Sequence, residues 1–120
     1  MNKPLILVTN DDGINAPGIR NLIDAVFPLG NVYVVAPDKP QSGMGHAITL
    51  NSTLRVLEHK NEKGIPEFST SGTPVDCVKL AIKKLLPRKP DLLVSGINHG
   101  SNSSISVIYS GTMSAAVEGA

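Results

Sequence analysis

The 120-residue sequence is poor in cysteine and aromatic residues, with one Cys, no Trp and an aromatic content of 3%. Cys77 cannot form an intrachain disulfide, and its apolar neighbours within a predicted helix indicate a core thiol. So few aromatic side chains argue against a base-stacking surface for single-stranded nucleic acid. The net charge is +1 and no dense basic run occurs, so we expect no nucleic acid polymer as a partner.

Long apolar runs and several familiar motifs are also missing. No run approaches the roughly 18 apolar residues of a membrane span, and no secretory signal pattern opens the chain. We therefore expect no membrane partner and a cytoplasmic location. Neither the G-x-x-x-x-G-K-[ST] phosphate loop nor G-x-G-x-x-G after the first strand is present, so nucleoside triphosphate hydrolysis and dinucleotide binding lack their usual motifs.

What is present predicts one globular α/β domain over residues 1–120, since 41% of the residues are hydrophobic and 18% charged. Buried strands are predicted at residues 5–8, 31–36 and 91–95, because these runs are apolar and end in turn residues. Amphipathic helices are predicted between them. Their apolar stripes are Ile19, Leu22, Ile23, Val26 and Phe27 in the first helix, and Val75, Val78, Ala81, Ile82, Leu85 and Leu86 in the second.

The remaining segments are less regular. Residues 37–46 contain two Pro and two Gly without periodicity and predict a long loop. Short alternating runs at 48–50, 54–57 and 67–70 predict a small antiparallel excursion at the edge of the sheet. Residues 105–109 form a brief apolar segment, and residues 113–120 have helical composition.

Asp11 and Asp12 follow the first predicted strand directly and precede Gly13. Asp-Gly is a strong turn signal, so an ordinary turn is one interpretation of this stretch. The other is a metal site, because two adjacent carboxylates repel each other and a divalent cation relieves that repulsion.

Oxygen-bearing side chains follow the other strands too. Ligands of open parallel sheets bind beyond the carboxyl ends of the strands, and there the second strand is followed by Ser42 and the third by Asn98. Together with Asp11 and Asp12 they make an all-oxygen set, which suits one hard divalent ion, Mg or Mn, and not zinc.

Ser110-Gly111-Thr112 precedes the last predicted helix. Exposed N–H groups at a helix start favour a phosphate group, although the same residues also make an ordinary N-cap. His46, His59 and His99 are isolated, and we assign none of them a catalytic role.

Five blocks, in order, resemble the stationary-phase survival protein SurE family. They are Val8-Thr9-Asn10-Asp11-Asp12-Gly13 with Ala16-Pro17-Gly18-Ile19; Val35-Ala36-Pro37-Asp38 with Ser42-Gly43; Gly72-Thr73-Pro74-Val75-Asp76-Cys77-Val78; Pro90-Asp91 with Ser95-Gly96-Ile97-Asn98-His99-Gly100; and Tyr109-Ser110-Gly111-Thr112 with Ala115-Ala116 and Glu118-Gly119. The blocks touch almost the whole chain, which makes the resemblance highly specific.

The resemblance implies a metal-dependent phosphomonoesterase, a 5′/3′-nucleotidase that hydrolyses nucleoside 5′- and 3′-monophosphates. It implies a Rossmann-like three-layer fold with a mostly parallel sheet. The family's metal ligands fall on Asp11, Asp12, Ser42 and Asn98, and its phosphate-binding turn falls on Ser110, Gly111 and Thr112. Catalytic roles are expected for Asp11 and Asp12, with Asp11 the first candidate for nucleophile or base.

Family members are longer and form homo-oligomers, so the resemblance also predicts a sheet that is incomplete at the C-terminus. One alternative is therefore a truncated, non-catalytic fragment that binds metal or nucleotide only. Another is a receiver-like signalling module, which also has an acidic pair after its first strand but needs an Asp where this chain has Asn98. A dehalogenase-type phosphotransferase needs one residue between its aspartates, and here Asp11 and Asp12 are adjacent.

Overall fold

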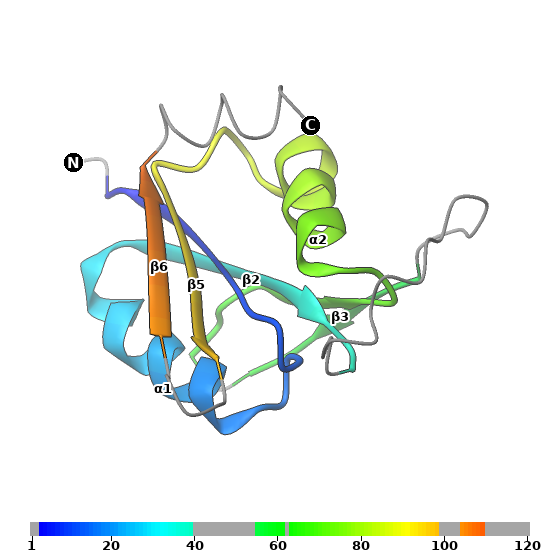
Figure 1. The fold of residues 1–120 in the computed structure, drawn as a ribbon. Helices are drawn as coiled ribbons and strands as arrows, with labels where there is room; N and C mark the ends of the chain where they lie inside the picture. The colour runs from blue at the N-terminus through cyan, green and yellow to red at the C-terminus, as the bar shows by residue number, and fades with distance from the viewer. Residues whose placement is uncertain (1–2, 40–54, 62, 99–103, 110–120) are drawn as a thin grey trace.

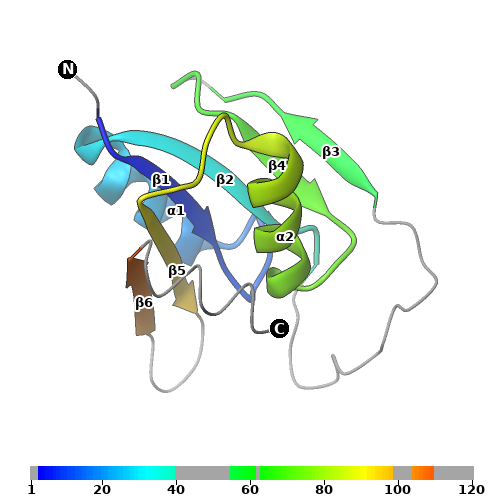
Figure 2. The same ribbon diagram turned by 90° about the horizontal axis from the view of Figure 1, so that it is seen from above.

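The computed structural model describes residues 3–39, 55–61, 63–98 and 104–109. Figure 1 shows the fold, and its sheet has the strand order β3-β4-β2-β1-β5-β6 (Figure 2). The inner strands β4, β2, β1 and β5 are parallel, whereas β3 and β6 pair antiparallel at the two edges. In chain order the elements are β1 (Leu5–Thr9), α1 (Pro17–Val26), the 3-10 turn η1 (Phe27–Leu29), β2 (Asn31–Pro37), β3 (Val56–His59), β4 (Glu67–Thr70), α2 (Pro74–Leu80), the π-helical turn η2 (Ala81–Leu85), β5 (Leu92–Asn98) and β6 (Ser104–Tyr109).

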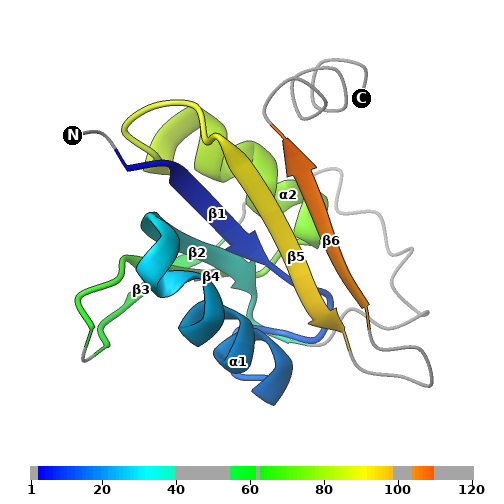
Figure 3. The same ribbon diagram turned by 90° about the vertical axis from the view of Figure 1, so that its left-hand side faces the viewer.

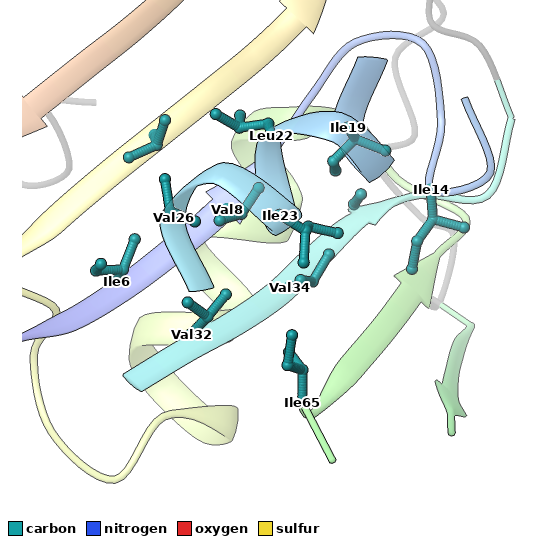
Figure 4. Close-up of a cluster of buried hydrophobic side chains, with 12 residues drawn as sticks. Ile6, Val8, Ile14, Ile19, Leu22, Ile23, Val26, Val32, Val34 and Ile65 are labelled. Carbon is teal, nitrogen blue, oxygen red and sulfur yellow. The ribbon is translucent and has the colours of Figure 1, made fainter. Parts of the chain in front are cut away.

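The two helices lie on opposite faces of this sheet, so the fold has three layers (Figures 2 and 3). On one face, α1 packs on Ile6 and Val8 of β1 and on the neighbouring strand β2 (Figure 4). On the other face, α2 packs with Leu7 and Val35. The predicted α/β class with a mostly parallel, Rossmann-like sheet is confirmed.

Burial on both faces explains why the first strand is a continuous apolar run. Side chains alternate between the faces of a strand, and all five residues of β1 are buried. β1 pairs with β2 on one side and with β5 on the other, so its backbone is hydrogen-bonded on both edges as well. The strand that precedes the Asp11-Asp12 pair is therefore enclosed on both faces and on both edges.

Both predicted helices are confirmed, with two corrections to their buried stripes. Phe27 is 41% exposed, because it lies beyond the end of α1, in η1. Val75 is 59% exposed, since the buried stripe of α2 is centred on Cys77, Val78 and Ala81 and leaves the first turn outside. Among the described residues, no helix is long and apolar enough to cross a membrane.

Two strands differ from the expectation at the sheet edges. β4 pairs antiparallel with β3 as predicted, but it also pairs parallel with β2, so it belongs to the main sheet. The apolar segment at 105–109 lies in strand β6, antiparallel to β5. The predicted loop at 37–46 beyond Lys39, the run at 48–50 and the helix at 113–120 lie outside the described residues.

An ion pair with a buried carboxylate joins α1 to the start of β4. The guanidinium of Arg20 donates to both carboxylate oxygens of Glu67, at 3.0 and 3.3 Å, and the amide of Asn61 donates to Oε2 at 2.8 Å. The Glu67 side chain is only 5% exposed, whereas that of Arg20 is 39% exposed. Glu67 therefore depends on its partners for solvation more than Arg20 does, because the Arg20 side chain is partly in contact with water.

We expect Arg20→Gln to lower the free energy of unfolding by about 2–3 kcal/mol, because it leaves a buried carboxylate with a single neutral donor. Glu67→Gln should cost less, since the Arg20 left behind is partly solvated. Urea unfolding of both variants measures the difference. A larger loss for Glu67→Gln than for Arg20→Gln would contradict this account of the pair.

Cys77 is a core thiol, as predicted. It is fully buried against the sheet, and its Sγ lies 3.1 Å from the hydroxyl oxygen of Thr70. Burial, which disfavours the charged thiolate, is the main cause that raises its pKa to about 11.

Because the thiolate is the reactive form, native Cys77 should react with iodoacetamide at pH 8 at least about tenfold more slowly than in the urea-unfolded chain. Mass spectrometry of timed samples measures the two rates. Equal rates in the folded and unfolded chain would show that folding neither shields the thiol nor raises its pKa.

Candidate metal centre

The sheet contains a point at which the strand order reverses, between β1 and β5. The chain builds β1, β2 and β4 outward in one direction and then returns to place β5 on the other side of β1. Loops at such a point separate and leave a crevice at the carboxyl ends of the strands. In a receiver module the third parallel strand in chain order pairs with the first. Here the third parallel strand is β4, and it pairs with β2, so this strand order excludes the receiver-like alternative.

Asp11, Asp12 and Asn98 follow or end the two strands at this point. Thr9, the last residue of β1, is opposite Ser95 of β5, and the two strands run in parallel (Figure 3). Asp11 and Asp12 follow Asn10 in the loop after β1, and Asn98 is the last residue of β5. The backbone therefore brings the two segments, far apart in sequence, to the same edge of the sheet.

Asn10 closes the turn that carries the two aspartates. Its side chain is fully buried, donates to the carbonyl of Gly13 at 2.8 Å and accepts from the Gly13 amide at 3.2 Å. Gly13 has φ +105°, a conformation that favours glycine. The sequence interpretation missed this role of Asn10, although Asn three residues before a turn glycine is a signal for such side-chain closure.

The turn presents the two carboxylates differently. Asp11 is exposed and Asp12 is half-buried, while Asn10 and Gly13 on either side of them are buried. The turn interpretation is confirmed, since a closed turn carries the two adjacent carboxylates at the carboxyl edge of the sheet. The metal interpretation is compatible with this turn and stays a prediction. Both residues also make interactions within the protein.

Backbone hydrogen bonds fix this turn to the neighbouring strands. The amide of Ile14 donates to the carbonyl of Pro37 at the end of β2, at 2.8 Å, and Ile14 itself is buried in the core beneath α1. The amide of Asp38 then donates to Thr70 at the end of β4, also at 2.8 Å. The carboxyl ends of three parallel strands are thus linked in series, which holds the turn in place relative to the sheet.

Several predicted site residues lie outside the described part of the chain. They are Ser42, Ser110, Gly111 and Thr112, and for Asn98 the structure describes the backbone alone. Among the described residues, no three His, Cys, Asp or Glu side chains cluster around a common point. The predicted ligand set is of another kind, with two carboxylates, one hydroxyl and one amide, and it stays a prediction.

The described residues suit a hard cation. The Asp11 and Asp12 carboxylates supply charged oxygen ligands, which Mg and Mn prefer. At the end of β1, the hydroxyl oxygen of Thr9 is buried and has no hydrogen-bond partner within the described residues. A buried hydroxyl of this kind is available to a ligand or to its water shell, at the same end of the strand as the two carboxylates.

Comparison with known proteins points to one family. The family model described as "Survival protein SurE" matches residues 6–120. Proteins named "5'-nucleotidase SurE" are similar to this chain: that of Flavobacterium johnsoniae is 72% identical over 117 residues, and that of Flavobacterium psychrophilum is 69% identical over 119 residues. These matches cover 97% and 98% of this chain but 45% and 46% of the relatives, so the chain spans about half their length.

A solved structure gives the same result. The crystal structure of the SurE protein from Aquifex aeolicus is similar with a TM-score of 0.68 and 44% sequence identity. The similarity covers 82% of this chain and 39% of that chain.

The buried Asn10 side chain yields a stability prediction. Asn10→Ala removes both bonds to Gly13 and should lower the free energy of unfolding by about 1–3 kcal/mol, because buried backbone groups lose their partners. Asn15→Ala, at an exposed position of the same loop, is the matched control and should change it by less than about 0.5 kcal/mol. Urea unfolding gives both values, and equal effects would show that Asn10 does not hold the turn.

Proposed function

The chain belongs to the SurE family, and from this premise we propose that it acts as a metal-dependent phosphomonoesterase that hydrolyses nucleoside 5′- and 3′-monophosphates to nucleoside and phosphate. The observation that carries the proposal is the closed Asp11-Asp12 turn at the strand-order reversal between β1 and β5. The names of the relatives, 5'-nucleotidase SurE, support the substrate class.

In this proposal Asp11, Asp12, Ser42 and Asn98 hold one divalent ion, Mg or Mn. When bound, such an ion would polarise a phosphoryl oxygen and stabilise the negative charge that develops on it. The fold of the chain holds the metal ligands in position. Asn10 and the bond from Ile14 to Pro37 keep the Asp11-Asp12 turn fixed, so little reorganisation is needed when a ligand binds.

The proposal also assigns residues that bind the phosphate group and a residue that starts the displacement at phosphorus. We assign Ser110, Gly111 and Thr112 to the phosphate group, since backbone N–H groups and hydroxyls at a helix start bind phosphate oxygens. Asp11 is exposed, so a substrate or an attacking water can reach its carboxylate. It acts in the displacement at phosphorus either as the nucleophile or as the base that takes a proton from water.

The second candidate function is binding without turnover. It is favoured by one observation, namely that the chain spans 45% and 46% of the length of the two Flavobacterium relatives. The proposed metal ligands all lie within this chain, so metal binding needs only the residues present. Catalysis also needs a pocket that holds the nucleoside beside the metal.

Asp11→Asn and Asp12→Asn should each lower phosphate release from AMP by at least about 100-fold in the presence of Mn or Mg, because each removes a charged metal ligand. Chelation of the metal should have the same effect on the unsubstituted chain. A colorimetric phosphate assay measures the rates, and circular dichroism melts test whether the variants stay folded.

Asp24→Asn is the matched control, because Asp24 is an exposed aspartate on α1 whose ion pair with Lys63 lies at the surface. Its rate should equal that of the unsubstituted chain. Near-normal turnover by either Asp11→Asn or Asp12→Asn would refute the role of that aspartate as an essential metal ligand. Absence of metal-dependent phosphate release by the unsubstituted chain would refute the enzyme proposal. A folded chain that binds Mn and releases no phosphate would establish the second candidate in its place.

A further inference from the structure

Gly18, in the first turn of α1, lies in direct backbone contact with the end of β5. A Cβ atom added at Gly18 would lie 2.0 Å from the carbonyl oxygen of Ile97 and 3.3 Å from its Cβ. Ordinary contacts of a Cβ begin at 3.4 Å. There is consequently no room for any side chain at this position.

Space, not backbone conformation, is what requires glycine here. Positive φ occurs at Gly13, Gly64 and Gly96 among the described residues, and Gly18 is not among them. Glycine within a helix is about 1 kcal/mol less favourable than alanine, so local helix propensity favours Ala at this position. The close approach of α1 to β5 overrides that preference.

This contact joins the two segments of the candidate metal centre. On one side, Gly18 follows the Asp11-Asp12 turn by six residues and directly succeeds Pro17, the first residue of α1. On the other side, Ile97 immediately precedes Asn98. The contact lies between the two segments that carry the predicted ligands and fixes how closely they approach.

We propose that Gly18 is a positioning residue, which sets the distance between the Asp11-Asp12 turn and Asn98 and thereby the affinity of the site for its divalent ion. The inference rests on the proposed function, since it takes these residues as metal ligands. Mg tolerates only small departures from ligand distances of about 2.0–2.1 Å. A Cβ at Gly18 meets a backbone carbonyl that no side-chain rotation can move, so α1 or the end of β5 must shift.

The test is Mn²⁺ binding to the 120-residue chain, measured by electron paramagnetic resonance of the free ion, with a thermal melt of each variant. Gly18→Ala should weaken Mn²⁺ binding at least about tenfold. Gly30→Ala is the matched control, because its Cβ would lie 2.3 Å from the carbonyl oxygen of Pro4, at the opposite ends of the strands. It should lower the melting temperature but leave the Mn²⁺ affinity unchanged.

A second pair of variants decides the matter if Gly18→Ala does not fold. Ile97→Ala and Leu92→Ala each shorten a partly buried side chain of β5 that packs on the same core, at opposite ends of the strand. Neither introduces a clash. Ile97→Ala leaves the carbonyl that faces Gly18 in place but removes the packing that holds this end of β5 against the core beneath α1. If the spacing of α1 and β5 sets the affinity, Mn²⁺ binding should weaken in Ile97→Ala and stay unchanged in Leu92→Ala.

The outcomes separate this inference from the proposed function. Mn²⁺ affinity that is retained in Gly18→Ala or, should that variant not fold, in Ile97→Ala overturns the role of Gly18 and leaves the metal site standing. Equal weakening by Gly18→Ala and Gly30→Ala overturns it as well, because the effect then follows stability. No Mn²⁺ binding by the unsubstituted chain overturns both the metal site and the positioning role.

Discussion

The burial of β1 is the constraint on which the rest of the structure depends. Its side chains are enclosed by α1 on one face and α2 on the other, and its edges pair with β2 and β5. A strand buried in this way cannot slip by one residue without exposing its apolar side chains, so its end point is fixed. The position of the polar turn that begins at Asn10 is fixed as well, because this turn directly follows the end of β1.

The turn itself is stabilised by polar contacts that the core alone would not supply. The Asn10 side chain satisfies both backbone groups of Gly13, and Ile14 returns to the core one residue later. Buried polar groups of this kind stabilise only one arrangement, since any other leaves a donor or acceptor unpaired. Two adjacent carboxylates can therefore be carried on a rigid support although they repel each other.

Much of the fold could be predicted from the sequence, because hydrophobic periodicity reports burial directly. The runs at 5–8 and 31–36 are strands, and the stripe Ile19, Leu22, Ile23 and Val26 is the buried face of α1. What the sequence did not reveal depends on contacts between distant segments. Strand β6 and the parallel pairing of β4 with β2 follow from the choice of partner strands, and the exposure of Val75 follows from how α2 lies on the sheet.

For the candidate site too, some residues could be predicted from the sequence, whereas others depend on contacts that appear only in the structure. Asp11, Asp12 and Asn98 were placed together by a rule of topology, which needs only the order and direction of the strands. Asn10 and Gly18 were not assigned roles, and both act through a specific contact, with Gly13 and with Ile97. Gly18 in particular is unfavourable by local helix propensity. A residue that contradicts its local preference marks a place where another demand is stronger, and here that demand is the approach of α1 to the strand that ends in Asn98.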